Sequence, residues 1–289
     1  MLSDLKKDNN KMKFDYREAA KKNTLIVAHR GVSGGNIPCN TMAAYEIALM
    51  QGADVIEMDV DMSADGQLVV FHPGREFEHL SIAESFENAT WDDISRYRYV
   101  NAGERCPTQF GVLKLDDFLE NFKNRCFINV DKFWEHPQEI YNAIHKHNMD
   151  EQVIVKSAPS DEVFRVLEEV APHLQFMPIV SEENTVHNVL KTKNLNYIGA
   201  EVLFTSEDSP VASDEFIEMM HKDNKLIWVN AIIYNYREQL AAGHSDDTAL
   251  TDSMEKGWGW LSDKGFDFIQ TDWPLMLINF LKETGRYYK

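Results

Sequence analysis

Short runs of apolar, often β-branched residues recur along this chain, and most of them are separated by segments whose apolar positions have helical spacing. The runs that read as strands cover residues 25–28, 55–59, 68–72, 126–130, 153–156, 176–180, 197–202, 226–229 and 266–270. Helical patterns cover residues 41–49, 116–122, 137–147, 161–170, 214–221 and 246–261. Strand–helix alternation predicts a parallel sheet, and this many units favours an α/β fold of the closed (β/α)8 TIM-barrel type.

Nine runs are one more than an eight-stranded barrel needs. The Asp65-Gly66 step lies between the second and third runs and is a hairpin signal. A connection this short cannot hold a crossover helix, so strict alternation breaks here and a local hairpin-like irregularity is predicted.

The chain shows no Pro/Gly/Ser-rich linker and no internal repeat, so we predict one domain over residues 1–289. Residues 75–108 are polar and predict an inserted loop with helices over the site. Residues 1–22 are polar and charged, so we expect an N-terminal helix or extension rather than a signal peptide.

Composition narrows the class of partner. Hydrophobic residues make up 44% of the 289 positions and charged residues 26%, which is ordinary for a globular protein. The formal net charge of −18 argues against nucleic acid and against stable association with anionic membranes. No run of about 18 apolar residues exists, and three scattered cysteines build neither a disulfide framework nor a zinc site. We therefore expect a cytoplasmic protein; its oligomeric state stays open.

Imidazole and acidic side chains end several of the apolar runs. They are His29 with Arg30 after the first run, Glu57 and Asp59 at the second, His72 at the third, and Asp131 after the fourth. Catalytic residues of such barrels come from these strand ends. Glu57 and Asp59 lie two apart and share one face of a strand, where buried carboxylates repel unless a cation lies between them. Oxygen ligands suit Mg²⁺ or Ca²⁺, so we predict one divalent cation, completed by Asp131, with His29 and His72 beside it.

With these residues in register, the chain resembles the glycerophosphodiester phosphodiesterase family. The matching segments are Ala28-His29-Arg30-Gly31, Asn40-Thr41, residues 52–60, residues 64–72, Trp228-Val229-Asn230 and residues 265–274. The resemblance is most specific in the first third of the chain. It implies hydrolysis of a small phosphodiester to glycerol 3-phosphate and an alcohol, with Glu57, Asp59 and Asp131 as metal ligands. It further implies that His29 and His72 form an acid–base pair, for which we favour His29 as base, and that Arg30 holds the phosphate.

The chain departs from the family pattern in two segments. After His72 the family has Asp and then Leu-x-Arg-Thr, whereas residues 73–80 here read PGREFEHL. The third acid is Asp131 where the family has Glu, and Phe133 stands where the family has Lys. Lys132 is expected on the opposite face of the strand, so Lys156 is our candidate for the missing cation.

Two further residues are candidate substrate contacts beside Lys156. Trp228 and Glu201 each lie in an apolar run, where they can line a pocket for the glycerol or head group. Two alternatives stay open: a phospholipase D-like activity on lysolipids or sphingolipids, and a non-catalytic barrel that binds phosphodiesters. An intact histidine pair weighs against the second, because binding alone needs no proton shuttle.

Overall fold

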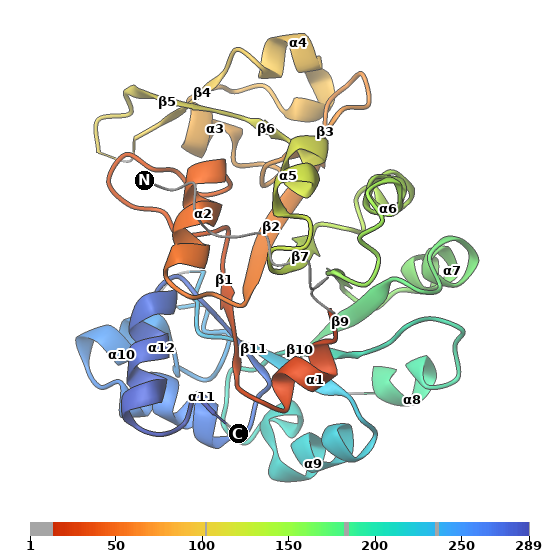
Figure 1. Cartoon of the computed structure of the whole chain (residues 1–289), viewed down its shortest axis with the longest axis vertical. Helices are drawn as coiled ribbons and strands as arrows, with labels where there is room; N and C mark the ends of the chain where they lie inside the picture. Colours follow the sequence, from red (N-terminus) through yellow and green to blue (C-terminus); the bar gives the residue numbers. More distant parts are fainter. Residues whose placement is uncertain (1–13, 102, 182–184, 235–236, 289) are drawn as a thin grey trace.

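The structure is a computed structural model that describes residues 14–101, 103–181, 185–234 and 237–288. Within them eight parallel strands form a closed barrel, because β1 pairs with both β12 and β2 (Figure 1). The barrel strands are β1 (Leu25–Ala28), β2 (Val55–Met62), β7 (Phe127–Asp131), β8 (Val153–Ser157), β9 (Gln175–Ser181), β10 (Gly199–Leu203), β11 (Leu226–Asn230) and β12 (Phe268–Thr271). The predicted TIM barrel is confirmed.

Helical segments lie between the barrel strands and surround them in Figure 1. They are α2 (Met42–Met50), α5 (Leu115–Phe122), α6 (Pro137–Lys146), α7 (Asp161–Val170), α8 (Val186–Leu190), α9 (Asp214–Lys222) preceded by the 3-10 turn η2 (Pro210–Ala212), α10 (Asp246–Thr251), the π-helical turn η3 (Glu255–Gly259), α11 (Trp260–Asp263) and α12 (Pro274–Glu283). Side-chain caps begin several of them: Thr41, Ser160, Ser213 and Ser245 each accept a backbone N–H of the first turn. The single helix predicted over 246–261 is wrong, because the backbone leaves helical geometry at Asp252.

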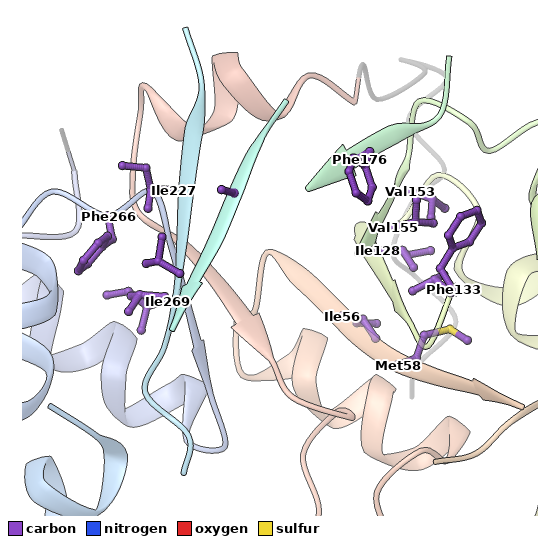
Figure 2. Packing of buried hydrophobic residues seen from close by; sticks show 14 of the residues in the cluster. Ile56, Met58, Ile128, Phe133, Val153, Val155, Phe176, Ile227, Phe266 and Ile269 are labelled. Carbon is purple, nitrogen blue, oxygen red and sulfur yellow. The ribbon is translucent and has the colours of Figure 1, made fainter. Parts of the chain in front are cut away.

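Alternation along the strands separates two apolar layers. Outward-facing residues such as Ile56, Ile128 and Val155 pack in a cluster with residues of the surrounding helices, part of which is drawn in Figure 2. Inward-facing residues such as Val55 and Trp228 fill the barrel interior near the strand starts. The interior is therefore apolar at its N-terminal end, and polar side chains are left to its C-terminal end.

The N-terminal end of the barrel is closed by α1 (Tyr16–Ala20). Tyr16 is buried, and its hydroxyl donates to the backbone carbonyls of Ile128 and Gln152 at 3.0 and 2.7 Å. The polar extension predicted for residues 1–22 is thus a helix over Tyr16–Ala20, and its first 13 residues lie outside the described part.

The hairpin expected at Asp65-Gly66 is confirmed. β2 continues beyond the barrel and pairs antiparallel with β3 (Leu68–Val70), in the register Val60↔Val70. Gly66 has φ +84° in the turn, a conformation that glycine adopts without a steric penalty. The third apolar run is therefore the return strand of a hairpin, not a barrel strand.

The following insertion forms a small unit beside the barrel, at the upper end of Figure 1. Its elements are α3 (Glu76–Leu80), the 3-10 turn η1 (Phe86–Asn88), α4 (Trp91–Ile94), β4 (Arg98–Val100), β5 (Pro107–Gly111) and β6 (Leu113–Lys114). It has its own apolar cluster, which includes Phe71, Phe86 and Tyr99. The antiparallel pair β4–β5 was not predicted, because few apolar residues alternate in these segments.

Candidate active site

A cavity of about 620 Å³ opens at the C-terminal ends of the barrel strands. Its floor consists of inward-facing polar residues one layer above the apolar interior. The predicted residues that line it are His29, Arg30, Glu57, His72, Asp131, Lys156 and Glu201. The structure thus brings together seven of the nine candidates, and Asp59 lies directly beside them.

Three carboxylates meet at one side of this cavity. The register of β2 and β7 places Glu57 opposite Asn129 and Asp59 opposite Asp131, so all three acids face inward. One oxygen of each of Glu57, Asp59 and Asp131 lies within 4.8 Å of the others. This spacing fits oxygen ligands around a single cation.

The electrostatics of these acids show a shortage of positive charge. Burial, together with the negative charge of Asp59, raises the pKa of Glu57 to about 7. Burial also acts to raise the pKa of Asp131, but Lys132 and Lys156 outweigh it and hold that pKa below its usual value. Oδ1 of Asp59 and Oδ1 of Asp131 are buried and have no hydrogen-bond partner among the described residues. Such oxygens are costly unless a cation binds them, so the residues present fit a metal ion.

Arg30 is fixed beside the acids by an unusual backbone conformation. Its φ is +54°, its N–H donates to Oε2 of Glu57 at 2.8 Å, and its guanidinium Nε lies 2.8 Å from Oδ2 of Asp59. The next residue, Gly31, cannot be replaced, since a Cβ there would meet the backbone of Ala44 at 2.7 Å. Asn40 donates to Oδ2 of Asp59 at 2.9 Å and orients that carboxylate.

His29 has an acidic partner that sequence reasoning did not assign. Its Nδ1 lies 2.9 Å from Oδ1 of Asp272, at the end of β12. Burial acts to lower the pKa of His29, but Asp272 and Glu57 outweigh it and raise that pKa. Since a carboxylate accepts, Nδ1 carries the proton and Nε2 is the ring nitrogen free for chemistry.

Asp272 is held in turn by a buried carboxylate on α10. Oδ2 of Asp246 accepts the backbone N–H of Asp272 at 2.8 Å. Oδ1 of Asp246 accepts from Nε1 of Trp258 at 2.7 Å and from the Thr271 hydroxyl at 2.8 Å. The turn that carries Asp272 is therefore tied to the helical layer.

His72 reaches the cavity through the hairpin. Phe71 donates its N–H to the carbonyl of Asp59 at 3.1 Å, so the return strand places the next residue near the acids. Nδ1 of His72 lies 2.8 Å from the Pro73 carbonyl, and burial lowers the pKa of His72. His72 therefore comes from the return strand of the predicted hairpin, and its side chain lines the cavity.

The opposite wall holds a buried ion pair. Nζ of Lys156 lies 2.7 Å from Oε2 of Glu201, whose other oxygen accepts from Asn230 at 2.5 Å. Trp228 is fully buried beneath this pair, and Lys156 lies 4.1 Å above its ring centroid. Trp228 is not among the cavity-lining residues, because it points inward one layer below Asn230. We therefore assign it to the barrel core, where it supports Lys156.

Lys132 corrects another expectation from the strand pattern. Its side chain was expected on the opposite face from Asp131, yet it lines the cavity with Nζ 3.1 Å from Oδ2 of Asp131. The strand ends at Asp131, and Lys132 has φ +62°, so alternation no longer applies. Such a turn leaves no signal in the apolar pattern.

Asn40 and Asp272 belong to segments that match the family pattern, but only the fold shows which residues they contact.

Comparisons with known proteins identify the family and the fold. The model of the glycerophosphoryl diester phosphodiesterase family matches residues 29–274, which include every site residue described above. A glycerophosphodiester phosphodiesterase of Caldanaerobacter subterraneus is 35% identical over 162 residues, covering 53% of this chain and 65% of that protein. The match thus spans less than two thirds of that relative. An uncharacterized protein of Bacillus subtilis, YqiK, is 26% identical over 252 residues, covering 83% of this chain and 100% of that protein.

Solved structures share the fold at lower identity. A glycerophosphoryl diester phosphodiesterase from Parabacteroides distasonis superposes with a TM-score of 0.76 at 16% identity, covering 96% of this chain and 98% of that one. A phosphodiesterase from Oleispira antarctica, solved with its product sn-glycerol-3-phosphate, gives a TM-score of 0.67 at 16% identity, covering 90% of this chain and 97% of that one.

Among the described residues, no helix combines the length and apolarity needed to cross a membrane. The match over residues 29–274 places this chain in the glycerophosphoryl diester phosphodiesterase family.

Proposed function

We propose that this protein hydrolyses a glycerophosphodiester to glycerol 3-phosphate and an alcohol, using one divalent cation, Mg²⁺ or Ca²⁺. The observation that carries the proposal is the convergence of three carboxylates, two of them fully buried, with two histidines and Arg30 on one cavity. A cation bound by Glu57, Asp59 and Asp131 would neutralise charge on the phosphoryl oxygens. Arg30 would bind the same phosphate.

The two histidines divide the proton transfers. His29, backed by Asp272, is the stronger base and takes at Nε2 the proton of the attacking group, which is water or a neighbouring hydroxyl of the substrate. Attack by the substrate hydroxyl would form a cyclic phosphodiester, which water must then open to give glycerol 3-phosphate. Asp272 then stabilises the imidazolium. His72 has a lowered pKa and therefore gives a proton readily to the departing alcohol oxygen. Lys156 and Glu201 lie across the cavity, where they would contact the organic part of the substrate.

Release of glycerol 3-phosphate from glycerophosphocholine, with and without Mg²⁺ or Ca²⁺, tests this function. We expect cation-dependent turnover, and we expect His29→Ala and His72→Ala each to lower it by about 100-fold or more. Turnover that persists in both variants would refute the assignment. A protein that binds the diester without hydrolysing it would instead be the non-catalytic barrel.

A second candidate is phospholipase D-like release of the head group from a lysolipid. The observation that favours it is an apolar wall of the cavity, formed by Ile179, Leu203, Ile232 and Leu240. Lysophosphatidylcholine offered in place of glycerophosphocholine separates the two, because only the lipid gains from that wall. The cytoplasmic location and the single domain over 1–289 remain predictions.

A further inference from the structure

Lys132 lies at the end of β7 in a conformation that costs free energy. Its φ is +62°, in the left-handed region, where the Cβ of any residue but glycine is crowded. Asp131 before it is the last residue of the strand. Lysine stands at this position although glycine would adopt the turn more easily.

Because of this turn, Lys132 and Phe133 lie on the sides opposite to those that strand alternation predicts. Phe133 is fully buried in the outer apolar layer, in one cluster with Met58 and Val155 (Figure 2). Lys132 lines the cavity instead, with Nζ 3.1 Å from Oδ2 of Asp131 and 4.9 Å from the ring centroid of Trp134. The left-handed backbone thus delivers an ammonium group to the acids.

Two of the other Arg and Lys side chains at the cavity differ from Lys132 in their ion-pair partners. Among the described residues, those lining the cavity are Arg30, which pairs with Asp59, Arg75, which pairs with Glu78, and Lys156, which pairs with Glu201. Arg75 and Lys156 therefore have counter-ions outside the three-acid cluster. Arg30 and Lys132 are paired with acids that would also bind the metal ion.

We propose that Lys132 is a catalytic residue that binds a phosphate oxygen of the substrate; this rests on the proposed function. The three acids carry three negative charges, which one divalent cation and Arg30 cancel. Lys132 then adds the single positive charge that matches the single negative charge of a phosphodiester. Without it the centre is neutral and attracts the anion weakly.

Binding of inorganic phosphate to the full chain in the presence of Mg²⁺, measured by calorimetry, tests the proposal without relying on turnover. We expect Lys132→Met to weaken phosphate binding by about 10- to 100-fold, the effect of losing a charge-assisted hydrogen bond. Lys132→Arg should retain binding to within about threefold. Mg²⁺ alone should bind Lys132→Met at least as tightly as the unaltered protein, because a competitor for Asp131 has been removed.

Lys132→Gly separates the chemical role from a structural one. It relieves the left-handed strain, so its unfolding midpoint should be no lower than that of the unaltered protein, while phosphate binding should fall as in Lys132→Met. Asn224→Gly is the matched control: Asn224 has φ +55° and lies outside the cavity, so binding should not change.

Unchanged phosphate affinity in Lys132→Met and Lys132→Gly would overturn the proposal, as would loss of Mg²⁺ binding in Lys132→Met or an unaltered protein that binds no phosphate. Phosphate binding that depends on Lys132 in a protein that does not hydrolyse glycerophosphocholine would support this proposal and refute only the proposed function.

Discussion

At the scale of single residues, the site is organised around carboxylates that cannot all be ionised without a counter-charge. Burial of Glu57, with the negative charge of Asp59 beside it, raises the pKa of Glu57 to about 7. Arg30 and Lys132 each neutralise part of the cluster, yet one oxygen each of Asp59 and Asp131 stays without a hydrogen bond among the described residues. The arrangement is best satisfied when a cation is bound.

The raised pKa of Glu57 predicts how cation affinity depends on pH. Below about pH 7 a bound proton must leave Glu57 before the cation binds, so affinity should fall up to tenfold per pH unit on acidification. Calorimetry with Mg²⁺ or Ca²⁺ between pH 5.5 and 8.5, in buffers of different ionisation enthalpy, should show proton release on binding near pH 7. Glu57→Gln should bind the cation weakly at every pH; a pH-independent affinity in the unaltered protein would contradict this role.

The division between the histidines predicts a dependence on the leaving group. An alcohol needs a proton as it departs, whereas p-nitrophenolate does not, so a general acid matters only for the first. His72→Ala should therefore lose about 100-fold on glycerophosphocholine but less than about tenfold on a p-nitrophenyl phosphodiester. His29→Ala should lose about 100-fold on both. The reverse pattern would make His29 the acid and His72 the base.

At the scale of elements, periodicity predicted the barrel because each strand buries both faces and each helix buries one. Seven of the eight barrel strands match a predicted apolar run to within two residues at each end, and β2 extends three residues beyond its run. The Asp-Gly turn also identified the one run that is a hairpin strand. Sequence reasoning therefore placed the acids and the histidines at one end of the fold.

Other features of the site depend on tertiary contacts that leave no local pattern. The turn at Lys132 and the pairing of Asp272 with His29 involve residues whose types alone predict neither. Trp228 was predicted to line the substrate pocket but lies one layer below it in the apolar interior. An apolar run does not show at which residue that interior ends. Asp246 lies in the first turn of α10, where acidic residues are common, so its type alone does not predict its role.

The hydrogen bonds of Asp246 predict that the helical layer helps to position Asp272, the partner of His29. Asp246→Ala leaves three donors without an acceptor, on Trp258, Thr271 and Asp272. We expect a loss of about 3 kcal/mol in the free energy of unfolding, and a lower kcat since Asp272 is less well placed. Urea denaturation and turnover measure the two effects. Asp247→Ala, an exposed neighbour on the same helix, is the control; equal losses in both variants would exclude a specific role for Asp246.

At the scale of the whole molecule, acids outside the three-carboxylate cluster also lie in poorly solvated surroundings. Burial raises the pKa of Asp54, Asp61 and Asp246 to about 6 each, and the chain as a whole has a net charge of −18. In the unfolded chain these groups titrate near pH 4. The native protein therefore binds more protons than the unfolded chain between about pH 4 and 7, and ionisation in that window opposes folding.

Stability without a cation should therefore fall as pH rises from about 5 to 7.5, because groups with raised native pKa values favour the fold only while they are protonated. A bound divalent cation should reverse the loss at pH 7.5: at a concentration 100 times its Kd it adds about 2.7 kcal/mol, roughly 5 °C in the unfolding midpoint. Thermal unfolding with EDTA and with Mg²⁺ at both pH values measures this. Glu57→Gln should be more stable than the unaltered protein in EDTA at pH 7.5 and should gain little from Mg²⁺, since it lacks both the buried charge and the ligand. A midpoint that rises with pH in EDTA, or an equal gain from Mg²⁺ in that variant, would show that the three acids at the cavity do not set the stability of the barrel.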